Sequence, residues 1–383
     1  MKILIIIASN QGTIASCAYQ LYKGILKEIP NSTIVVVCYG PYRSDGFHFN
    51  QATCLKLGWL SNSSITRIFV RFNLLKKIKL KYNINCSIST QAGPSVWNVL
   101  SGIGEYKIGI FHAVLKQFKV TGLKKYISFW LLYKSIFKCL NKKVGVSKKI
   151  VEDLKNTIGG DVQLCYNIHD VKQIREQALI DLEDIKEQKI FSKPVILYVG
   201  ALYYYIKAPD RLLNAFAAFK QNIQDDVQLV YIGQDIEDAS SKLMSIARVY
   251  NIENSVHFFG KRSNPYKYMK RSRMLVSPSR DEGLPGVVIE SCIVGTPCVV
   301  TNSTYGNWEI MQCEDLFNKK LSEIVKTDMG CITPNNTNNE SFTVKMLAEG
   351  MLDTYNRKSF NWANFNTSKY EYQSVVESLL SNM

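Results

Sequence analysis

The sequence predicts an α/β protein with two doubly wound domains, because one pattern of apolar run, loop and helical stretch opens both halves of the chain. The first half begins with an apolar run at Lys2–Ala8, a loop that contains Gly12, and a helical stretch at about 13–29. The second half begins in the same way at Val195–Gly200. This order is typical of a Rossmann-like domain, which binds its ligand at the carboxyl ends of parallel strands. With 383 residues, the chain is long enough for two Rossmann-like domains facing across a cleft.

Further short apolar runs predict the remaining strands of each domain. In the first domain these runs are 34–39, 84–89, 108–112 and 143–147, and in the second they are 227–232, 256–258, 274–277 and 298–301. Residues 43–63 lack a clear period and are expected to form a mobile loop. A charged helical stretch before Pro194 predicts that the first domain ends at 180 and that a linker at 181–194 leads to the second domain, 195–365.

The positive charge of the chain is concentrated in its first half. Residues 1–190 hold 27 Lys and Arg against 12 Asp and Glu, whereas residues 191–383 hold 20 of each, so the whole net charge of +15 lies in the first half. Such asymmetry predicts an anionic partner, either a membrane surface or a nucleic acid.

Two helical stretches in the basic half combine apolar and cationic side chains. In the stretch 65–80, apolar residues share one face and most of the basic residues, Lys79 among them, are expected elsewhere. The stretch 123–140 is rich in aromatic residues and lysines, and it is too short and too charged to span a bilayer. The second stretch is equally compatible with a core helix whose lysines face water. Together with the charge asymmetry, the two stretches favour peripheral contact with an anionic membrane.

The ten cysteines show no Cys-x-x-Cys spacing, and the four histidines are far apart, so neither a zinc site nor a disulfide framework is predicted. Reduced cysteines in the cytoplasm are the simpler interpretation. The apolar run at the start is too short for a signal peptide. No Asp-x-Asp occurs, a motif that can hold a divalent cation on a diphosphate.

Two glutamates mark the most informative segment, which lies between the apolar runs 274–277 and 298–301. Glu282 and Glu290 are separated by seven residues, and Gly283-Leu284-Pro285-Gly286 follows the first of them directly. The loop leads into a helical pattern, so its backbone N–H groups and the helix dipole would attract phosphate. Carboxylates accept hydrogen bonds from hydroxyls. The segment therefore predicts a nucleotide-sugar site.

This segment, with Pro278-Ser279 before it and Gly295-Thr296-Pro297 after it, closely resembles the Glu-x7-Glu region of glycosyltransferase family 4. The resemblance implies the GT-B fold, in which the C-terminal residues 366–383 cross back to the first domain. It also implies that Glu282 contacts the donor sugar and Glu290 the ribose. Gly283, Leu284, Pro285 and Gly286 would form the donor loop, in which Pro285 has no N–H to donate.

The resemblance extends to residues outside this segment. Lys207 matches the lysine that binds the donor diphosphate, and Gly200 matches the glycine at the preceding strand end. The arginine that usually follows that glycine is replaced by Ala201, so another cation is expected to take its place, with Arg262, Arg280 or a lysine of the first domain as candidates.

Three further positions are matched more loosely. The segment Phe258–Arg262 resembles the turn that holds the base, which makes Arg262 a donor-site candidate. Gly12 corresponds by position to a glycine next to the donor phosphate, and His112 to a histidine that contacts the donor sugar near the reaction centre. The resemblance therefore implies His112, Glu282 and Lys207 as the catalytic residues.

The function that these features favour is a metal-independent, retaining glycosyltransferase without a cofactor. It would move a sugar from a nucleotide donor to a lipid-linked saccharide in O-antigen or capsule biosynthesis, and the resemblance implies uracil as the base of that donor. The expected location is the cytoplasmic face of the membrane. Two alternatives remain open: a nucleotide-sugar epimerase of the same fold, which needs no membrane-binding surface, and a non-catalytic basic module that binds nucleic acid. The Glu282–Glu290 segment argues against nucleic acid as a partner.

Overall fold

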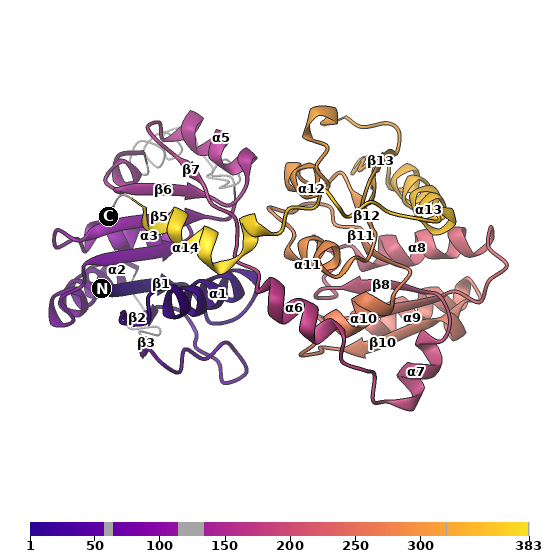
Figure 1. Cartoon of the computed structure of the whole chain (residues 1–383), viewed down its shortest axis with the longest axis horizontal. Coiled ribbons are helices and arrows are strands. Elements are labelled where there is room, and N and C mark those ends of the chain that lie inside the picture. Colours follow the sequence, from indigo (N-terminus) through magenta and orange to yellow (C-terminus); the bar gives the residue numbers. More distant parts are fainter. Residues whose placement is uncertain (57–63, 114–133, 319, 382) are drawn as a thin grey trace. The chain divides into compact units, whose positions relative to one another are not determined.

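The chain forms two compact units in the computed structural model, which describes residues 1–56, 64–113, 134–318, 320–381 and 383 (Figure 1). Of residues 64–69 the backbone alone is described. Unit 1 consists of Met1–Asp170 and Ser368–Met383, and unit 2 of Val171–Thr367. Each unit has its own parallel sheet covered by helices, as the sequence predicts.

Among the described residues, the sheet of unit 1 has seven strands in the order β3-β2-β1-β4-β5-β6-β7, all paired in parallel. Strand β1, Lys2–Ile7, is fully apolar beyond its first residue, because parallel strands inside a sheet are covered on both faces. The strands are β1 Lys2–Ile7, β2 Thr33–Cys38, β3 Thr53–Lys56, β4 Cys86–Thr90, β5 Tyr106–Phe111, β6 Lys142–Gly145 and β7 Gln163–Leu164. The helices with described bounds are α1 Thr13–Glu28, α2 Ser64–Lys81, α3 Ala92–Leu100, α5 Lys148–Thr157 and α14 Tyr372–Leu380.

The C-terminal helix α14 packs on α1 in unit 1 (Figure 1). Gly24 permits this close approach, since a Cβ there would lie 2.7 Å from Tyr372 Cδ1. The Tyr372 hydroxyl donates to Gln20 Oε1 at 2.8 Å, and Lys142 Nζ donates to the Ser378 carbonyl at 2.6 Å. The last helix of the chain is therefore part of the first unit.

Two expectations for unit 1 are wrong. Thr53–Cys54–Leu55–Lys56, expected within a mobile loop, form strand β3 and pair with β2. Lys79, expected among the basic residues away from the apolar face of its helix, is fully buried, because its ammonium group forms an ion pair with Glu105 at 2.5 Å. The apolar face of α2 likewise packs into the core through Leu75 and Ile78. These two side chains are therefore not available to a membrane.

Unit 2 contains a sheet of seven strands within the described ranges, in the order β10-β9-β8-β11-β12-β14-β13. All pairs are parallel except β13–β14. The strands are β8 Val195–Val199, β9 Gln228–Ile232, β10 Val256–Gly260, β11 Met274–Ser277, β12 Cys298–Thr301, β13 Val325–Thr327 and β14 Gly330–Thr333. The helices are α6 Val171–Ala178, α7 Ile185–Phe191, α8 Pro209–Lys220, α9 Ala239–Val249, α10 Tyr266–Arg271, α11 Gly286–Val294, α12 Tyr305–Ile310 and α13 Glu340–Asn356.

The division between the units falls at Asp170/Val171, earlier than the boundary predicted at 180. Helix α6 belongs to unit 2 because it packs against α10 and α11. The stretch 181–194, expected to be a linker, contains α7, whose Glu187 accepts hydrogen bonds from Arg262 and Tyr268 of unit 2. Buried polar contacts thus join these residues to the second unit.

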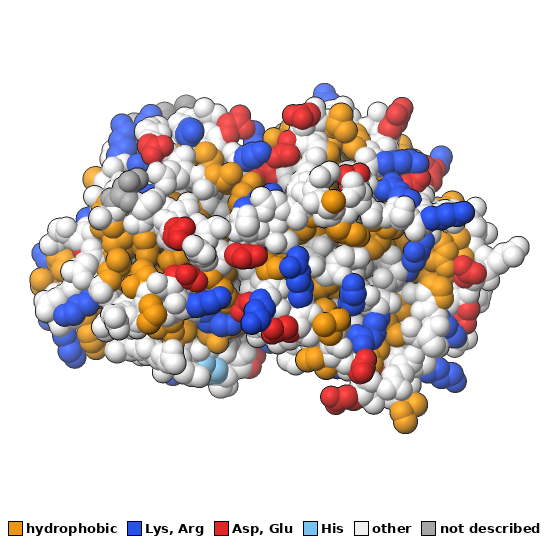
Figure 2. All heavy atoms as spheres, in the orientation of Figure 1, with side chains coloured by type: hydrophobic (Ala, Val, Ile, Leu, Met, Phe, Trp, Pro, Cys, Tyr) orange, Lys and Arg blue, Asp and Glu red, His pale blue; other side chains and the backbone are white. Residues whose placement is uncertain are grey.

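Of the expected helix 123–140, residues 123–133 lie outside the described part of the chain. Lys and Arg side chains of unit 1 are scattered among apolar and acidic ones on the face drawn in Figure 2. No helix within the described ranges is both long and apolar enough to cross a membrane.

Candidate active site

Three loops of unit 2 meet at one edge of its sheet, because β8, β11 and β12 are adjacent, parallel strands. Gly200–Ala208 follows β8, Pro278–Pro285 follows β11 and Asn302–Thr304 follows β12. The carboxyl edge of such a sheet is where doubly wound domains bind ligands. The predicted residues Lys207 and Glu282 lie on the first two of these loops.

Lys207 and Glu282 are in direct contact although 75 positions separate them in the sequence. The distance from Lys207 Nζ to Glu282 Oε1 is 2.5 Å, and Ser279 Oγ donates to the same carboxylate oxygen at 2.8 Å. The Lys207 side chain is 31% exposed and that of Glu282 is 13% exposed. A cation and a carboxylate with access to solvent therefore share one small site.

The loop after Glu282 is held against the neighbouring helix α12. Thr304 Oγ1 donates to the Gly283 carbonyl at 2.7 Å, and a Cβ at Gly306 would lie 2.6 Å from that same oxygen. Leu284, predicted as a donor-loop residue, buries its side chain, so its backbone is the part that remains for a ligand.

Pro285 is the N-cap of α11 and provides no side-chain cap. The first N–H groups of a helix, here those of Gly286 and Val287, have no intrahelical acceptor. Together with the helix dipole, they form a suitable site for an anion. The end of α11 that follows the Lys207–Glu282 pair along the chain is therefore open to a phosphate or a sugar oxygen.

Glu290 lies on α11 and is partly buried. Burial raises the pKa of its carboxyl group to about 8, so the group is mostly protonated at neutral pH. A protonated carboxyl can both donate to and accept from a hydroxyl. Glu290 thus has the chemistry that the predicted ribose contact needs.

The raised pKa of Glu290 predicts a pH-dependent effect of Glu290→Gln on stability. Between the ordinary value of 4.5 and about 8, the folded protein binds more protons at this site than the unfolded chain, so its stability falls as pH rises through that window. Glutamine removes this loss. We expect Glu290→Gln to match wild type near pH 5 and to exceed it by roughly 3–4 kcal/mol at pH 8.5.

Urea denaturation followed by circular dichroism at pH 5, 7 and 8.5 measures this difference. The control is Glu349→Gln, since Glu349 is an exposed carboxylate on α13. A stability difference between Glu290→Gln and wild type that does not change with pH would show that Glu290 ionises normally.

Gly200 lies where β8 ends, as predicted. Its N–H donates to the Ile232 carbonyl at 2.9 Å, and a Cβ at Gly233 would lie 1.7 Å from the Gly200 oxygen. The next residue, Ala201, accepts a hydrogen bond from the Tyr198 hydroxyl at 2.8 Å. The loop is therefore closely packed at Ala201, the position where family 4 usually has an arginine.

Both arginine candidates for that role have other partners. Arg262 donates to Glu187 at 2.8 Å and lies over the Phe259 ring. The hydrogen bond to Glu187 raises the pKa of the Arg262 guanidinium. Arg280 contacts Glu340 and Asp210. Carboxylates therefore bind both guanidinium groups in this structure, and Arg262 as a donor-binding residue stays a prediction.

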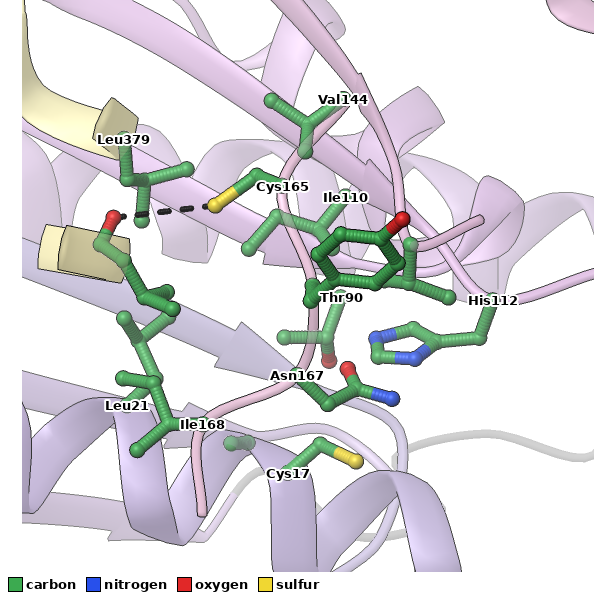
Figure 3. Close-up of a pocket in the computed structure, with 14 residues that line it drawn as sticks. Cys17, Leu21, Thr90, Ile110, His112, Val144, Cys165, Asn167, Ile168 and Leu379 are labelled. Atoms are coloured by element: carbon green, nitrogen blue, oxygen red, sulfur yellow. Dashed lines mark hydrogen bonds between the residues drawn. The ribbon is translucent and has the colours of Figure 1, made fainter. Parts of the chain in front are cut away.

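The two predicted residues of unit 1 lie at the carboxyl ends of β1 and β5. Gly12 is the N-cap of α1 with φ of 84°, a conformation that favours glycine. His112 directly follows β5, and its imidazole points toward Thr90 and Asn167 in a small cavity of about 20 Å³ (Figure 3). The cavity has room for a single water molecule.

His112 Nε2 is buried and has no hydrogen-bond partner within the described part of the chain. Burial lowers the pKa of His112 to about 4, so the imidazole is neutral at physiological pH. A neutral imidazole can accept or donate one hydrogen bond. The Nε2 atom of His112 is therefore available to a ligand.

The residues described by the structure contain no group of three His, Cys, Asp or Glu side chains arranged as a metal site. All ten cysteines are among the described residues, and none forms a disulfide.

Comparisons with known proteins agree with this architecture. Residues 181–320 match the family model "Glycosyl transferases group 1". Over 167 residues, the chain is 31% identical to the N-acetylgalactosamine-N,N'-diacetylbacillosaminyl-diphospho-undecaprenol 4-alpha-N-acetylgalactosaminyltransferase of Campylobacter jejuni, covering 43% of this chain and 42% of the relative. Over 111 residues, it is 30% identical to the capsular polysaccharide biosynthesis glycosyltransferase CapH of Staphylococcus aureus, covering 28% and 31%.

These matches span less than half the length of the curated relatives. A solved structure, the lipopolysaccharide outer core galactosyltransferase WaaB in its apo form, aligns over 100% of both chains with a TM-score of 0.68 and 16% identity. The chain therefore has the GT-B fold, and its residues 181–320, which include Lys207, Glu282 and Glu290, are similar to glycosyl transferases of group 1.

Proposed function

We propose that this protein is a glycosyltransferase that moves a sugar from a nucleotide-sugar to a lipid-linked saccharide. Two neighbouring features carry the proposal. One is the Lys207–Glu282 pair, and the other is the start of α11 at Gly286, shortly after Glu282, which has no side-chain cap. A cation and free backbone N–H groups bind a diphosphate, and a carboxylate binds sugar hydroxyls. The match of residues 181–320 to glycosyl transferases of group 1 supports this assignment.

In the proposed reaction, Lys207 and the N–H groups of Gly286 and Val287 stabilise the negative charge that develops on the leaving diphosphate. When the diphosphate draws Lys207 away, Glu282 becomes free to accept hydrogen bonds from the sugar. Ser279 remains hydrogen-bonded to Glu282 and fixes its orientation. Glu290 contacts the ribose, and His112 of unit 1 contacts the donor sugar, as the resemblance to family 4 implies.

The finer features of the proposal come from that resemblance. The enzyme retains the anomeric configuration by front-face attack, with the leaving phosphate taking the acceptor proton, and works without a metal ion or cofactor. The base of the donor is uracil. Four measurements test these features: the anomeric configuration of the product, the preference among donor bases, the activity in EDTA and the activity without added cofactor.

The acceptor and location are supported by the curated relatives. The name of the Campylobacter jejuni relative includes a diphospho-undecaprenol-linked saccharide, and that of the Staphylococcus aureus relative includes capsular polysaccharide. We extend this to an undecaprenol-type lipid-linked acceptor in capsule or O-antigen biosynthesis. Such an acceptor lies in a membrane, so the enzyme would act peripherally at its cytoplasmic face, with the basic first half of the chain meeting anionic lipid.

A donor screen tests this function. Purified protein is mixed with UDP-, GDP- and ADP-sugars without added metal, and its thermal unfolding is followed with Glu282→Ala and Lys207→Ala in parallel. A ligand at 100 times its Kd stabilises the folded state by about 2.7 kcal/mol. We expect one class of nucleotide-sugar to stabilise the wild type and neither variant. The exposed Lys345→Ala on α13 serves as the control. Equal stabilisation of all four proteins would place the donor elsewhere.

A further inference from the structure

Arg280 connects the two loops that carry Lys207 and Glu282. Its backbone N–H donates to the Ile206 carbonyl at 2.7 Å, and its Nη1 donates to the Tyr204 carbonyl. Ile206 directly precedes Lys207, and Arg280 is two residues before Glu282. One residue therefore fixes the loop after β8 against the loop after β11, immediately beside the ion pair.

The guanidinium group of Arg280 is oriented by acidic residues. Its Nη2 donates to Glu340 Oε1 at 2.8 Å and lies 3.5 Å from Asp210 Oδ2. Asp210 lies in the first turn of α8, and Glu340 is the first residue of α13. The arginine thus contacts both helices as well as both loops.

Glu340 is itself held by a buried arginine. Arg211 is fully buried, and its Nε and Nη2 donate to the two oxygens of Glu340 at 2.9 and 2.8 Å. Arg211 Nη1 also donates to the Pro278 carbonyl at 3.0 Å. Burial by itself would raise the pKa of Glu340, but its bonds to Arg211 and the charges of both arginines lower that pKa overall. The carboxylate stays ionised and forms a fixed anchor for Arg280.

We infer that Arg280 is a positioning residue that sets the spacing between Lys207 and Glu282. The role of this spacing in catalysis rests on the proposed function. A lysine in place of Arg280 would keep the charge but would lose the planar set of donors that reaches the Tyr204 carbonyl and Glu340 together. Correct placement of Lys207 therefore requires the guanidinium group.

The first test measures UDP binding by calorimetry in wild type, Arg280→Ala, Arg280→Lys and Arg273→Ala. Arg273 directly precedes β11, at the opposite edge of the sheet, and donates to the Tyr355 and Arg357 carbonyls. We expect both Arg280 variants to bind UDP about tenfold more weakly, which equals 1.4 kcal/mol. Arg273→Ala should bind UDP with wild-type affinity, even if its thermal stability falls as much as that of the Arg280 variants. Equal affinity of wild type and both Arg280 variants would overturn the inference.

The second test needs no nucleotide. Limited acetylation with acetic anhydride, read by mass spectrometry, measures the reactivity of Lys207 in the folded protein. Loosening the loops in Arg280→Ala should expose Lys207 and raise its labelling rate toward that of Glu282→Ala, whereas Arg273→Ala should label at the wild-type rate. Unchanged labelling in Arg280→Ala would refute the positioning role. If wild type binds no UDP but the labelling differs as expected, the donor assignment fails and the positioning role stands.

Discussion

Lys207→Ala is expected to lower kcat/KM for the nucleotide-sugar by about 10²–10³-fold, the range seen when one preorganised donor to a developing anion is removed. Lys207 is the cation that the structure places against Glu282, and Arg262 and Arg280 are bound to other carboxylates. With Ala201 at the position where family 4, which this segment resembles, has an arginine, the loss of Lys207 should be severe.

Initial-rate kinetics over a range of donor concentrations measure this effect. The matched control is again Lys345→Ala, which should keep the wild-type kcat/KM. Lys207→Arg retains the positive charge and should recover part of the activity, because the charge matters more than the shape for a diphosphate. If Lys207→Ala retained wild-type kcat/KM, the site would not act as proposed.

Lys79→Met is expected to reduce the free energy of unfolding by about 3–5 kcal/mol, the cost of leaving a buried charge without its partner. Lys79 and Glu105 side chains are both fully buried. Lys79 Nζ also donates to the carbonyl and side-chain oxygens of Asn98, at 2.8 and 2.9 Å. Burial acts to raise the pKa of Glu105, but its bonds to Lys79 and the Ile103 N–H lower it overall, so the carboxylate is charged at neutral pH.

Urea denaturation followed by circular dichroism checks this prediction. The double variant Lys79→Met/Glu105→Gln removes both charges and should regain most of the lost stability. Lys149→Met, which breaks an exposed pair with Glu152 in α5, should change the free energy of unfolding by less than about 1 kcal/mol. A similar small change in Lys79→Met would mean that the buried pair contributes little.

Ten of the described strands, β1, β2, β4, β5, β6 and β8 to β12, could be predicted because buried parallel strands appear in the sequence as short apolar runs. The antiparallel strand Val325–Thr327 and its partner Gly330–Thr333 were not predicted, since a three-residue edge strand leaves almost no pattern. The burial of Lys79 could not be predicted from its helix, because its partner Glu105 lies 26 residues away on a different segment.

In the candidate site, too, residues within a local motif could be predicted, whereas contacts between distant residues could not. Glu282, Glu290 and the glycine loop stand close together in the sequence, so a local motif identifies them. Lys207 is identified by its resemblance to the lysine that follows a strand-end glycine in family 4, and the structure brings it to Glu282. The role of Arg280 depends on Glu340, 60 residues later, and the sequence between them carries no signal that joins the two.

The most direct test of the central claim is transfer of a radiolabelled sugar from the stabilising nucleotide-sugar into an organic-extractable lipid fraction, with the full-length protein and a bacterial membrane extract as the acceptor source. We predict label in the lipid fraction with wild type and Lys345→Ala, and about 10²–10³-fold less with Lys207→Ala. Donor that is epimerised or left unchanged, with no label in the lipid fraction, would contradict a glycosyltransferase acting on a lipid-linked saccharide.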